Sequence, residues 1–214
     1  PGSAAPGVIL SLGLGLSVLV AVIQIEGNVS QQISERLPNE APAYFFIDIQ
    51  PHQVEEFDRI VNTTPGVSGL IREPVVRGRI VEINGVAADP KNVPPENQWA
   101  LRGDRAFSST AAMKPNTELV AGEWWPSDYA GPPLISFDSK LADGFGVGVG
   151  DSLTINVLGR EIKAEIASLR DIDWGSLRFD FAVVLSPGVL EGAPHTHIAA
   201  ANATPDAEKV LERA

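Results

Sequence analysis

The sequence predicts an α+β protein in which an N-terminal transmembrane helix and a stalk precede a split βαβ unit that carries a β-rich insertion. Three observations support this fold class. The first 25 residues carry no charge, a strand–helix–strand pattern follows, and glycine and proline, 20 and 17 of 214 residues, favour short strands and turns. With 44% hydrophobic and 20% charged residues, the chain can bury a sizeable core.

Charge and cysteine content exclude several functions. The 27 acidic residues outnumber the 16 lysines and arginines, and the resulting net charge of -11 argues against a groove for nucleic acid. The absence of cysteine excludes thiol catalysis, disulfide bonds and thiolate metal sites. It leaves the redox compartment open.

The N-terminal segment Val8–Ile25 is an uncharged run in which only Gln24 is strongly polar. As a helix it would cover about 27 Å, close to the hydrocarbon thickness of a bilayer. A signal peptide is disfavoured, because a basic region before the run and an A-x-A site after it are both missing. A buried core helix is the other alternative. We predict a membrane span at 8–25 and, because the chain begins with proline, expect a fragment of a longer protein.

Small residues recur every four positions within the predicted span, at Gly13, Ser17 and Ala21. Such a stripe would let another transmembrane helix approach closely, although small residues are also common in membrane helices generally. Apolar residues continue at a helical spacing as far as Leu37, before Pro38. We therefore predict a stalk at residues 26–42, helical from Glu26 to Leu37, where Pro38 ends the helix.

A strand–helix–strand unit follows the predicted stalk. Apolar and aromatic residues alternate through 44–49, and Pro51 with two glutamates in the next turn suits a helix start. A second strand from Val67 is expected to break at Pro74 and to resume from Val75 to Ile83. Asn84-Gly85 then predicts a tight turn, and the proline-rich stretch 88–97 is a candidate domain boundary.

The remaining chain is predicted to consist mainly of short strands. A hairpin is expected around Gly159-Arg160, a helical turn at 140–145, and a last helix after Thr204. If the last strand and helix pair with the first βα unit, a further strand is expected beyond Ala214 and the middle of the chain is an insertion. The strands are predicted at 134–137, 152–158, 161–167, 179–185 and 196–201.

One tetrapeptide suggests catalysis. Gly150-Asp151-Ser152-Leu153 spells the nucleophile motif of GDSL esterases, whose serine follows a strand and whose histidine belongs to a D-x-x-H element. Here the clear strand follows Ser152, and glycine and proline stand three residues before His195 and His197. A serine without an oriented base is not a nucleophile, so a turn that enters a strand is the favoured interpretation. The alternative function is a membrane-anchored GDSL-type esterase that uses Ser152.

Three further patterns were weighed as binding sites. His195 and His197 would share one face of a strand as metal ligands do, but no spacing indicates a third ligand, so surface histidines are favoured. The glycine run 144–150 lacks the following helix and the lysine of a phosphate loop. Five arginines lie within 72–105, where an acidic or phospholipid headgroup could bind but ion pairing on a sheet face is favoured. They are Arg72, Arg77, Arg79, Arg102 and Arg105.

Taken together, the apolar span and stalk, the segment FFIDIQPHQVEEFDRIV, the run from LVAGEWWPSDYAG to GDSLTINVLGR and the block SPGVLEGAPHTHIA resemble the FtsX-like permease subunits of ABC transporters. The resemblance covers nearly the whole chain and is strongest to the YbbP-like permeases, with LolC- and MacB-type subunits sharing the scheme. It places a β-rich subdomain beside a porter-like βαβ subdomain. The residues at the family's positions are Gly122, Trp124, Trp125, Gly150, Asp151, Ser152, Leu153, Thr154 and Gly159.

The resemblance implies a non-catalytic module with no catalytic, cofactor-binding or metal-binding residue. It implies a cognate ABC ATPase and other transmembrane helices of the same permease as partners, sometimes a lysophospholipase-like esterase, lipid or lipoprotein cargo, and no nucleic acid. It also implies a location in the cell (inner) membrane with residues 26–214 extracytoplasmic. The expected organisation is a cytoplasmic-side linker at 1–7, a transmembrane helix at 8–25, a stalk at 26–42, a porter-like subdomain at 43–97 with 193–214, and a β-rich inserted subdomain at 98–192.

Overall fold

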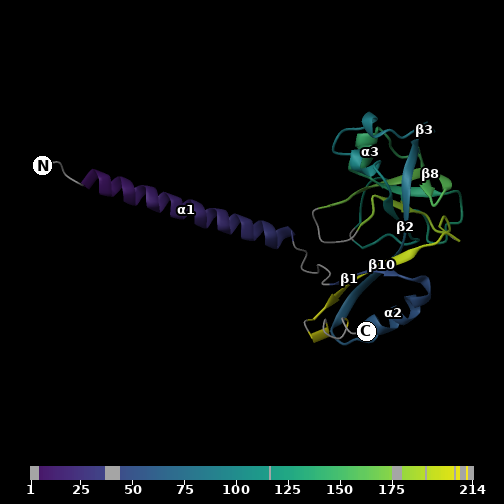
Figure 1. The fold of residues 1–214 in the computed structure, drawn as a ribbon, viewed down its shortest axis with the longest axis horizontal. Coiled ribbons are helices and arrows are strands. Elements are labelled where there is room, and N and C mark those ends of the chain that lie inside the picture. The colour runs from purple at the N-terminus through teal and green to yellow at the C-terminus, as the bar shows by residue number, and fades with distance from the viewer. Residues whose placement is uncertain are drawn as a thin grey trace. The chain divides into compact units, whose positions relative to one another are not determined.

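The computed structural model describes residues 5–36, 44–115, 117–174, 180–190 and 192–204, together with residues 206, 207 and 211. The chain divides into two compact units. The first contains the N-terminal helix and the second contains the whole β-sheet (Figure 1). Each unit is described by itself.

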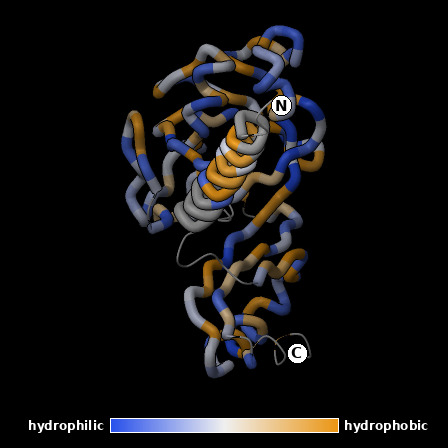
Figure 2. Tube along the Cα trace, turned by 90° about the vertical axis from the view of Figure 1, so that its left-hand side faces the viewer, coloured by the Kyte–Doolittle hydropathy of each residue, from blue (hydrophilic) through white to orange (hydrophobic). Residues whose placement is uncertain are grey.

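The N-terminal unit is one long helix, α1 (Ala5–Arg36), of 32 residues. The predicted helix over 8–25 and its continuation toward Pro38 are thus confirmed as helix. Its described large apolar side chains, from Ile9 to Ile25, are 46% to 77% exposed, and Figure 2 shows this stretch as mainly hydrophobic. In the described part of the chain, no helix meets the combined criteria of length and apolarity for a membrane span. The assignments of 8–25 to the membrane and of 26–42 to a stalk stay predictions.

The second unit begins with the predicted strand–helix–strand pattern. Strand β1 (Tyr44–Ile49) leads through a short 3-10 turn, η1 (Pro51–Gln53), into α2 (Val54–Thr63). Strand β10 (Thr196–Ala203) lies between β1 and β2 and is antiparallel to both. The expected pairing of the last strand with the first βα unit is confirmed, and Figure 1 shows α2 beside these strands.

Strand β2 (Val67–Ile83) runs without interruption for 17 residues, so the predicted break at Pro74 is wrong. At Pro74 the strand pairs with β10, whereas pairing with β4 starts only at Val75. Proline lacks an N–H donor but is tolerated where one edge of a strand has no partner. The strand therefore passes from the three-stranded part of the sheet, which consists of β1, β10 and β2 as far as Val75, into the rest of the unit.

Beyond Val75 the sheet closes on itself. The pairing order is β2, β4, β9, β6, β8 and β7, and β7 pairs with β2 again, which completes a barrel of six strands. Two of its pairs, β4 with β9 and β6 with β8, are parallel. The strands are β4 (Arg105–Ser109), β6 (Leu134–Asp138), β7 (Ser152–Val157), β8 (Arg160–Asp171) and β9 (Val183–Leu185).

The barrel interior is the main hydrophobic core of the unit. Phe107, Phe137 and Ile155 are at most 1% exposed and come from three different strands. Inward-pointing side chains fill the interior of a small barrel completely. The barrel is therefore a packed core rather than a channel.

Short elements connect the strands. Helix α3 (Ser139–Phe145) is capped by the Asp138 side chain, which accepts from the Leu141 N–H at 2.8 Å. The Asn84-Gly85 turn leads into β3 (Val86–Ala87), and both turn residues have positive φ, as the sequence predicts. Two further 3-10 turns, η2 (Pro90–Asn92) and η3 (Gln98–Ala100), lie in and after the proline-rich loop.

Other sequence predictions are confirmed only in part. Strands β4 and β5 (Glu118–Gly122) were not predicted, and the strand expected at 179–185 is only three residues long as β9, with residue 179 outside the described residues. Of the predicted last helix, only 206, 207 and 211 are described, and all three are helical. The division into 43–97 with 193–214 and 98–192 stays a prediction.

Candidate functional site

Two neighbouring residues in the middle of β2, Arg72 and Glu73, each start a set of ion pairs. Successive side chains of a strand point to opposite faces, so the two residues connect β2 with different neighbours. Both lie just before Val75, which pairs with β10 on one side and with β4 on the other. We call the six charged residues concerned the ion-pair chain: Asp58, Arg72, Glu73, Lys114, Asp180 and Arg170.

Arg72 joins three elements. Its Nε and Nη2 atoms donate to the two carboxylate oxygens of Asp58 on α2, both at 2.9 Å. Its Nη1 lies 2.9 Å from Nδ1 of His197 on β10. A planar guanidinium suits such a two-pronged contact with a carboxylate, so this residue fixes α2 against the sheet.

Burial and the contact with Arg72 together keep the His197 ring neutral. Arginine has only donors, so Nδ1 of the imidazole must accept and the ring is neutral. Burial, and then the positive charges of Arg72 and His195, lower the pKa of His197 to about 4, although Asp58 partly opposes this. The His195 ring packs edge-on against it at 5.2 Å between centroids. The two histidines do share one face, as predicted, but their contacts are structural.

Glu73 is 5% exposed and connects β2 with the barrel. Its carboxylate accepts from the Ser108 hydroxyl on β4 at 2.7 Å and lies 3.0 Å from Nζ of Lys114. The Lys114 ammonium also lies 3.9 Å from Asp180 and over the ring of Phe181. A buried carboxylate is stable only with such partners.

Arg170 on β8 is the last residue of the ion-pair chain and is 2% exposed. Its guanidinium donates to Asp180 at 2.8 Å, to the Ser136 hydroxyl at 3.0 Å and to the Phe181 carbonyl at 2.6 Å. Ser168 in turn donates to Ser136 at 2.8 Å. These bonds connect β8, β6 and the segment before β9.

The arrangement suits the fixing of positions rather than acid–base chemistry. Each carboxylate of the ion-pair chain lies within 4 Å of a cationic side chain, and the buried Ser108 and Ser168 hydroxyls donate to acceptors within the network. Catalysis needs a base that faces a reacting group in a cleft, which these buried pairs do not provide. The ion-pair chain thus connects α2, the three-stranded part and the barrel by charged contacts.

Asn84 and Asp151 hold the turn at Ser152 in place. The Ser152 backbone N–H donates to the Asn84 side chain at 2.9 Å, and the Asn84 amide donates to Asp151 at 3.0 Å. Asp151 also accepts from the Gly148 N–H at 2.7 Å. Among the described residues, the hydrogen bonds of His195 and His197 go to other groups. The GDSL tetrapeptide is therefore a turn that leads into β7.

The other candidate patterns are resolved in the same way. The glycine run follows α3 and leads into a strand, unlike a phosphate loop. Within the described ranges, no group of three or more His, Cys, Asp or Glu side chains could hold a metal ion. Of the arginine group, Arg72 pairs with Asp58 and Arg79 with Asp104, which confirms ion pairing for these two.

The sequence contains one weak signal for the ion-pair chain, which the motif search above does not use. Along β8 the buried positions alternate, and Arg170 falls on the same alternation as Ile162, Ala164 and Ile166. A charge at an inward position requires a buried partner. Its partners Asp180 and Ser136 lie 10 and 34 residues away, so no local pattern could identify them.

Comparisons with known proteins show what the chain is similar to. No protein-family model matches the chain. A search among curated proteins finds an uncharacterized ABC transporter permease, YbbP of Escherichia coli (strain K12), which is 27% identical over 186 residues. The match covers 87% of this chain and 22% of that permease, so the chain spans about a fifth of the relative's length. The predicted resemblance to ABC transporter permeases of the YbbP type is confirmed.

Among solved structures, a domain of a proposed permease protein from Porphyromonas gingivalis is similar at a TM-score of 0.40 and 13% identity. The alignment covers 82% of this chain and 77% of that domain. A TM-score of this size does not establish a shared fold. The similarity to an ABC transporter permease therefore rests on the sequence comparison.

Proposed function

We propose that this chain is the extracytoplasmic module of an ABC transporter permease subunit. In this proposal a partner ATPase hydrolyses ATP, and the module couples that hydrolysis to export, extraction or signalling at the outer side of the cell membrane without catalysis of its own. The observation that carries the proposal is the 27% identity to an ABC transporter permease across 87% of the chain.

The path of coupling is proposed to run from the membrane to the β-rich unit. Residues 8–25 would cross the bilayer after a cytoplasmic-side linker at 1–7, residues 26–42 would form the stalk, and residues 26–214 would be extracytoplasmic. The 32-residue helix with its exposed apolar side chains supports the span, because such a surface is stable in lipid. The small-residue stripe supports contact with other helices of the same permease.

The ion-pair chain supports a mechanical role for the β-rich unit. A single strand, β2, belongs to both the three-stranded part and the barrel. Arg72 binds α2 and β10 within the first part, whereas Glu73 reaches the barrel through Ser108 and Lys114. A displacement applied at one end would therefore move the unit as one piece. The esterase partner and the lipid or lipoprotein cargo implied by the resemblance find no support in the comparison, and the proposal does not include them.

The coupling can be tested on the full-length parent permease with its ATPase in proteoliposomes. Replacing residues 26–214 by a flexible linker should uncouple ATP hydrolysis from the permease and so change its rate. The Ser152→Ala variant is the matched control and should hydrolyse ATP as the wild type does. An unchanged rate after the replacement would argue against mechanical coupling, and loss of function in the Ser152→Ala variant would favour the esterase alternative.

The proposed orientation can be tested by thiol labelling. The 214-residue segment contains no cysteine, so a single introduced cysteine is specific within it. Val86→Cys, at a side chain that is 68% exposed, should react with a membrane-impermeant maleimide on intact cells. Ser3→Cys should react only after lysis. The reverse pattern would overturn the proposed orientation.

A further inference from the structure

The hairpin turn between β7 and β8 carries an unusual residue. Leu158 is 69% exposed and has φ 51°, and the following Gly159 has φ 89°. Asparagine, aspartate and glycine are the residues that such a turn prefers, because a bulky side chain is strained at positive φ. Neither burial nor turn geometry therefore explains a leucine here, and strained surface residues often mark functional positions.

Leu158 forms a ridge between two hollows of the surface. One hollow, of about 450 Å³, is lined by Arg77 and Arg79 of β2 together with Asp104. The other, of about 360 Å³, is lined mainly by apolar residues and by Arg160. A third hollow, of about 430 Å³, shares Arg160 with the second. The second hollow thus shares lining residues with each of the other two, and we call the three together the Leu158 groove.

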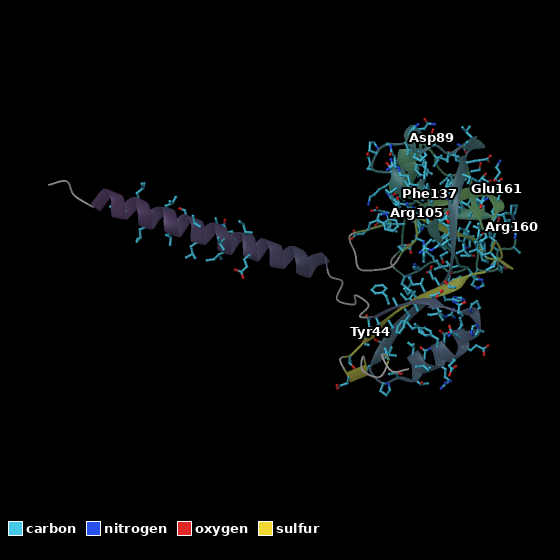
Figure 3. The ribbon with its side chains drawn as sticks, viewed as in Figure 1. Tyr44, Asp89, Arg105, Phe137, Arg160 and Glu161 are labelled. Atoms are coloured by element: carbon cyan, nitrogen blue, oxygen red, sulfur yellow. The ribbon has the colours of Figure 1, made fainter. Side chains whose placement is uncertain are left out.

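The charges of the Leu158 groove are mainly positive, although the chain has a net charge of -11. Arg79 pairs with Asp104 at 3.1 Å, but both side chains are more than half exposed. Within the described residues, Arg77 and Arg160 have no ion-pair partner. Figure 3 shows Arg160 with Glu161 at the start of β8, away from Tyr44. A local cationic surface of this kind selects anionic groups.

The spacing of the arginines indicates the shape of the ligand. Arg77 and Arg79 lie two positions apart on the exposed face of β2, which places their backbones about 7 Å apart. An extended peptide presents side chains on one face with the same repeat. Two carboxylates at positions i and i+2 could therefore each meet one guanidinium, while an apolar side chain further along reaches the hollow beyond Leu158.

We infer that the Leu158 groove binds an extended acidic segment of a partner protein. The segment presents two carboxylates to Arg77 and Arg79, and an apolar residue packs against Leu158. Asp104 is the internal competitor, because its carboxylate occupies Arg79 through an exposed ion pair that a ligand carboxylate can replace. The site is independent of the proposed coupling to an ATPase.

The test uses the whole chain in detergent and a fluorescein-labelled peptide with two glutamates two positions apart, followed by serine, leucine and proline. Fluorescence anisotropy should show saturable binding that weakens with salt. Arg77→Gln or Arg79→Gln should weaken binding by about tenfold, whereas Asp104→Asn should strengthen it by about threefold to tenfold. Arg59→Gln, at an exposed arginine of α2, is the matched control and should leave affinity unchanged.

Leu158→Asn separates a binding role from a structural one. Asparagine suits the positive φ, so this variant should unfold at a higher urea concentration than the wild type while it binds the peptide less tightly. Unchanged peptide affinity in this variant would overturn the inference, as would weaker binding by Asp104→Asn. A peptide of the same composition with adjacent glutamates must bind less tightly. Tighter binding of soluble dihexanoyl-phosphatidylglycerol at this groove than of the peptide would assign the site to lipid instead.

Discussion

The removal of the Arg170 side chain is the sharpest test of the ion-pair chain. Arg170→Met keeps most of the aliphatic volume but deletes a guanidinium that is 2% exposed. The change removes the partner of the Asp180 carboxylate at 2.8 Å. It also removes the bonds that the guanidinium donates to the Phe181 carbonyl and to the Ser136 hydroxyl, which still accepts from Ser168. Lys114, at 3.9 Å, is too far from Asp180 to replace this contact fully. The variant should therefore lose most of the free energy that the pair contributes.

The breaking of a buried pair from one side costs about 3–5 kcal/mol of unfolding free energy. With a urea dependence of about 2 kcal/mol per M, the unfolding midpoint should fall by about 1.5–2.5 M. Tryptophan fluorescence of the whole chain in mild detergent can follow this transition, because all 4 tryptophans lie between residues 99 and 174. Arg170→Lys retains the charge but not the planar fork and should lie between wild type and Arg170→Met.

The exposed pair between Arg79 and Asp104 provides the control. Both side chains are about half exposed, at 54% and 55%, so Arg79→Met should cost about 0–1 kcal/mol. Arg170→Met should therefore lower the urea midpoint much more than Arg79→Met does. If Arg170→Met and Arg79→Met lower the urea midpoint equally, burial does not strengthen the ion-pair chain. The proposal that this network fixes the elements against one another is then wrong.

Three further predictions concern pH, packing and the GDSL serine. Because the folded pKa of His197, about 4, lies below its ordinary value of 6.5, the unfolded state binds the proton more readily between these values. The stability contributed by the neutral ring is therefore fully present above pH 6.5 and is lost as the pH falls toward 4, a dependence that His197→Gln should flatten in urea titrations. Gly78→Ala should cost about 1–3 kcal/mol, since a Cβ there would lie 2.8 Å from the Asn156 carbonyl oxygen, whereas Gly148→Ala meets nothing within 4 Å and should not destabilise the fold in the same assay. Wild-type Ser152 should not react with a fluorophosphonate probe, and labelling at this residue, detected by mass spectrometry, would revive the esterase alternative.

Local patterns predict those parts of the fold that local interactions determine. The alternation of β1, the amphipathic face of α2 and the hairpin of β7 with β8 were all predictable, because period and turn residues are encoded within a few positions. Strand β4 was missed because Arg105–Ser109 is short and only one of its residues, Phe107, is a large apolar residue. Its pairing with β2 and β9 makes it a strand, and pairing is a tertiary interaction.

The same distinction explains the outcomes at Pro74 and at the ion-pair chain. The rule that proline breaks a strand depends on whether the missing N–H faces a partner, which the sequence does not reveal. The buried charges posed a similar problem. Arg170 stands at an inward position that a reader of the sequence can find, but its connection through Asp180 and Lys114 to Glu73 requires the closed barrel.

The shared strand β2 also determines when the protein can acquire its structure during synthesis. Its first residue, Val67, pairs with Ala203, near the end of this segment, and its last residue, Ile83, pairs with Leu153. A ribosome therefore releases β2 long before β7 and β10 emerge, although β3 and β4 can pair with it earlier. The positions that β7 and β10 cover stay open to other chains until then. Contacts between residues so far apart in sequence make folding slow. The nascent chain consequently depends on protection against aggregation until β10 has left the exit tunnel.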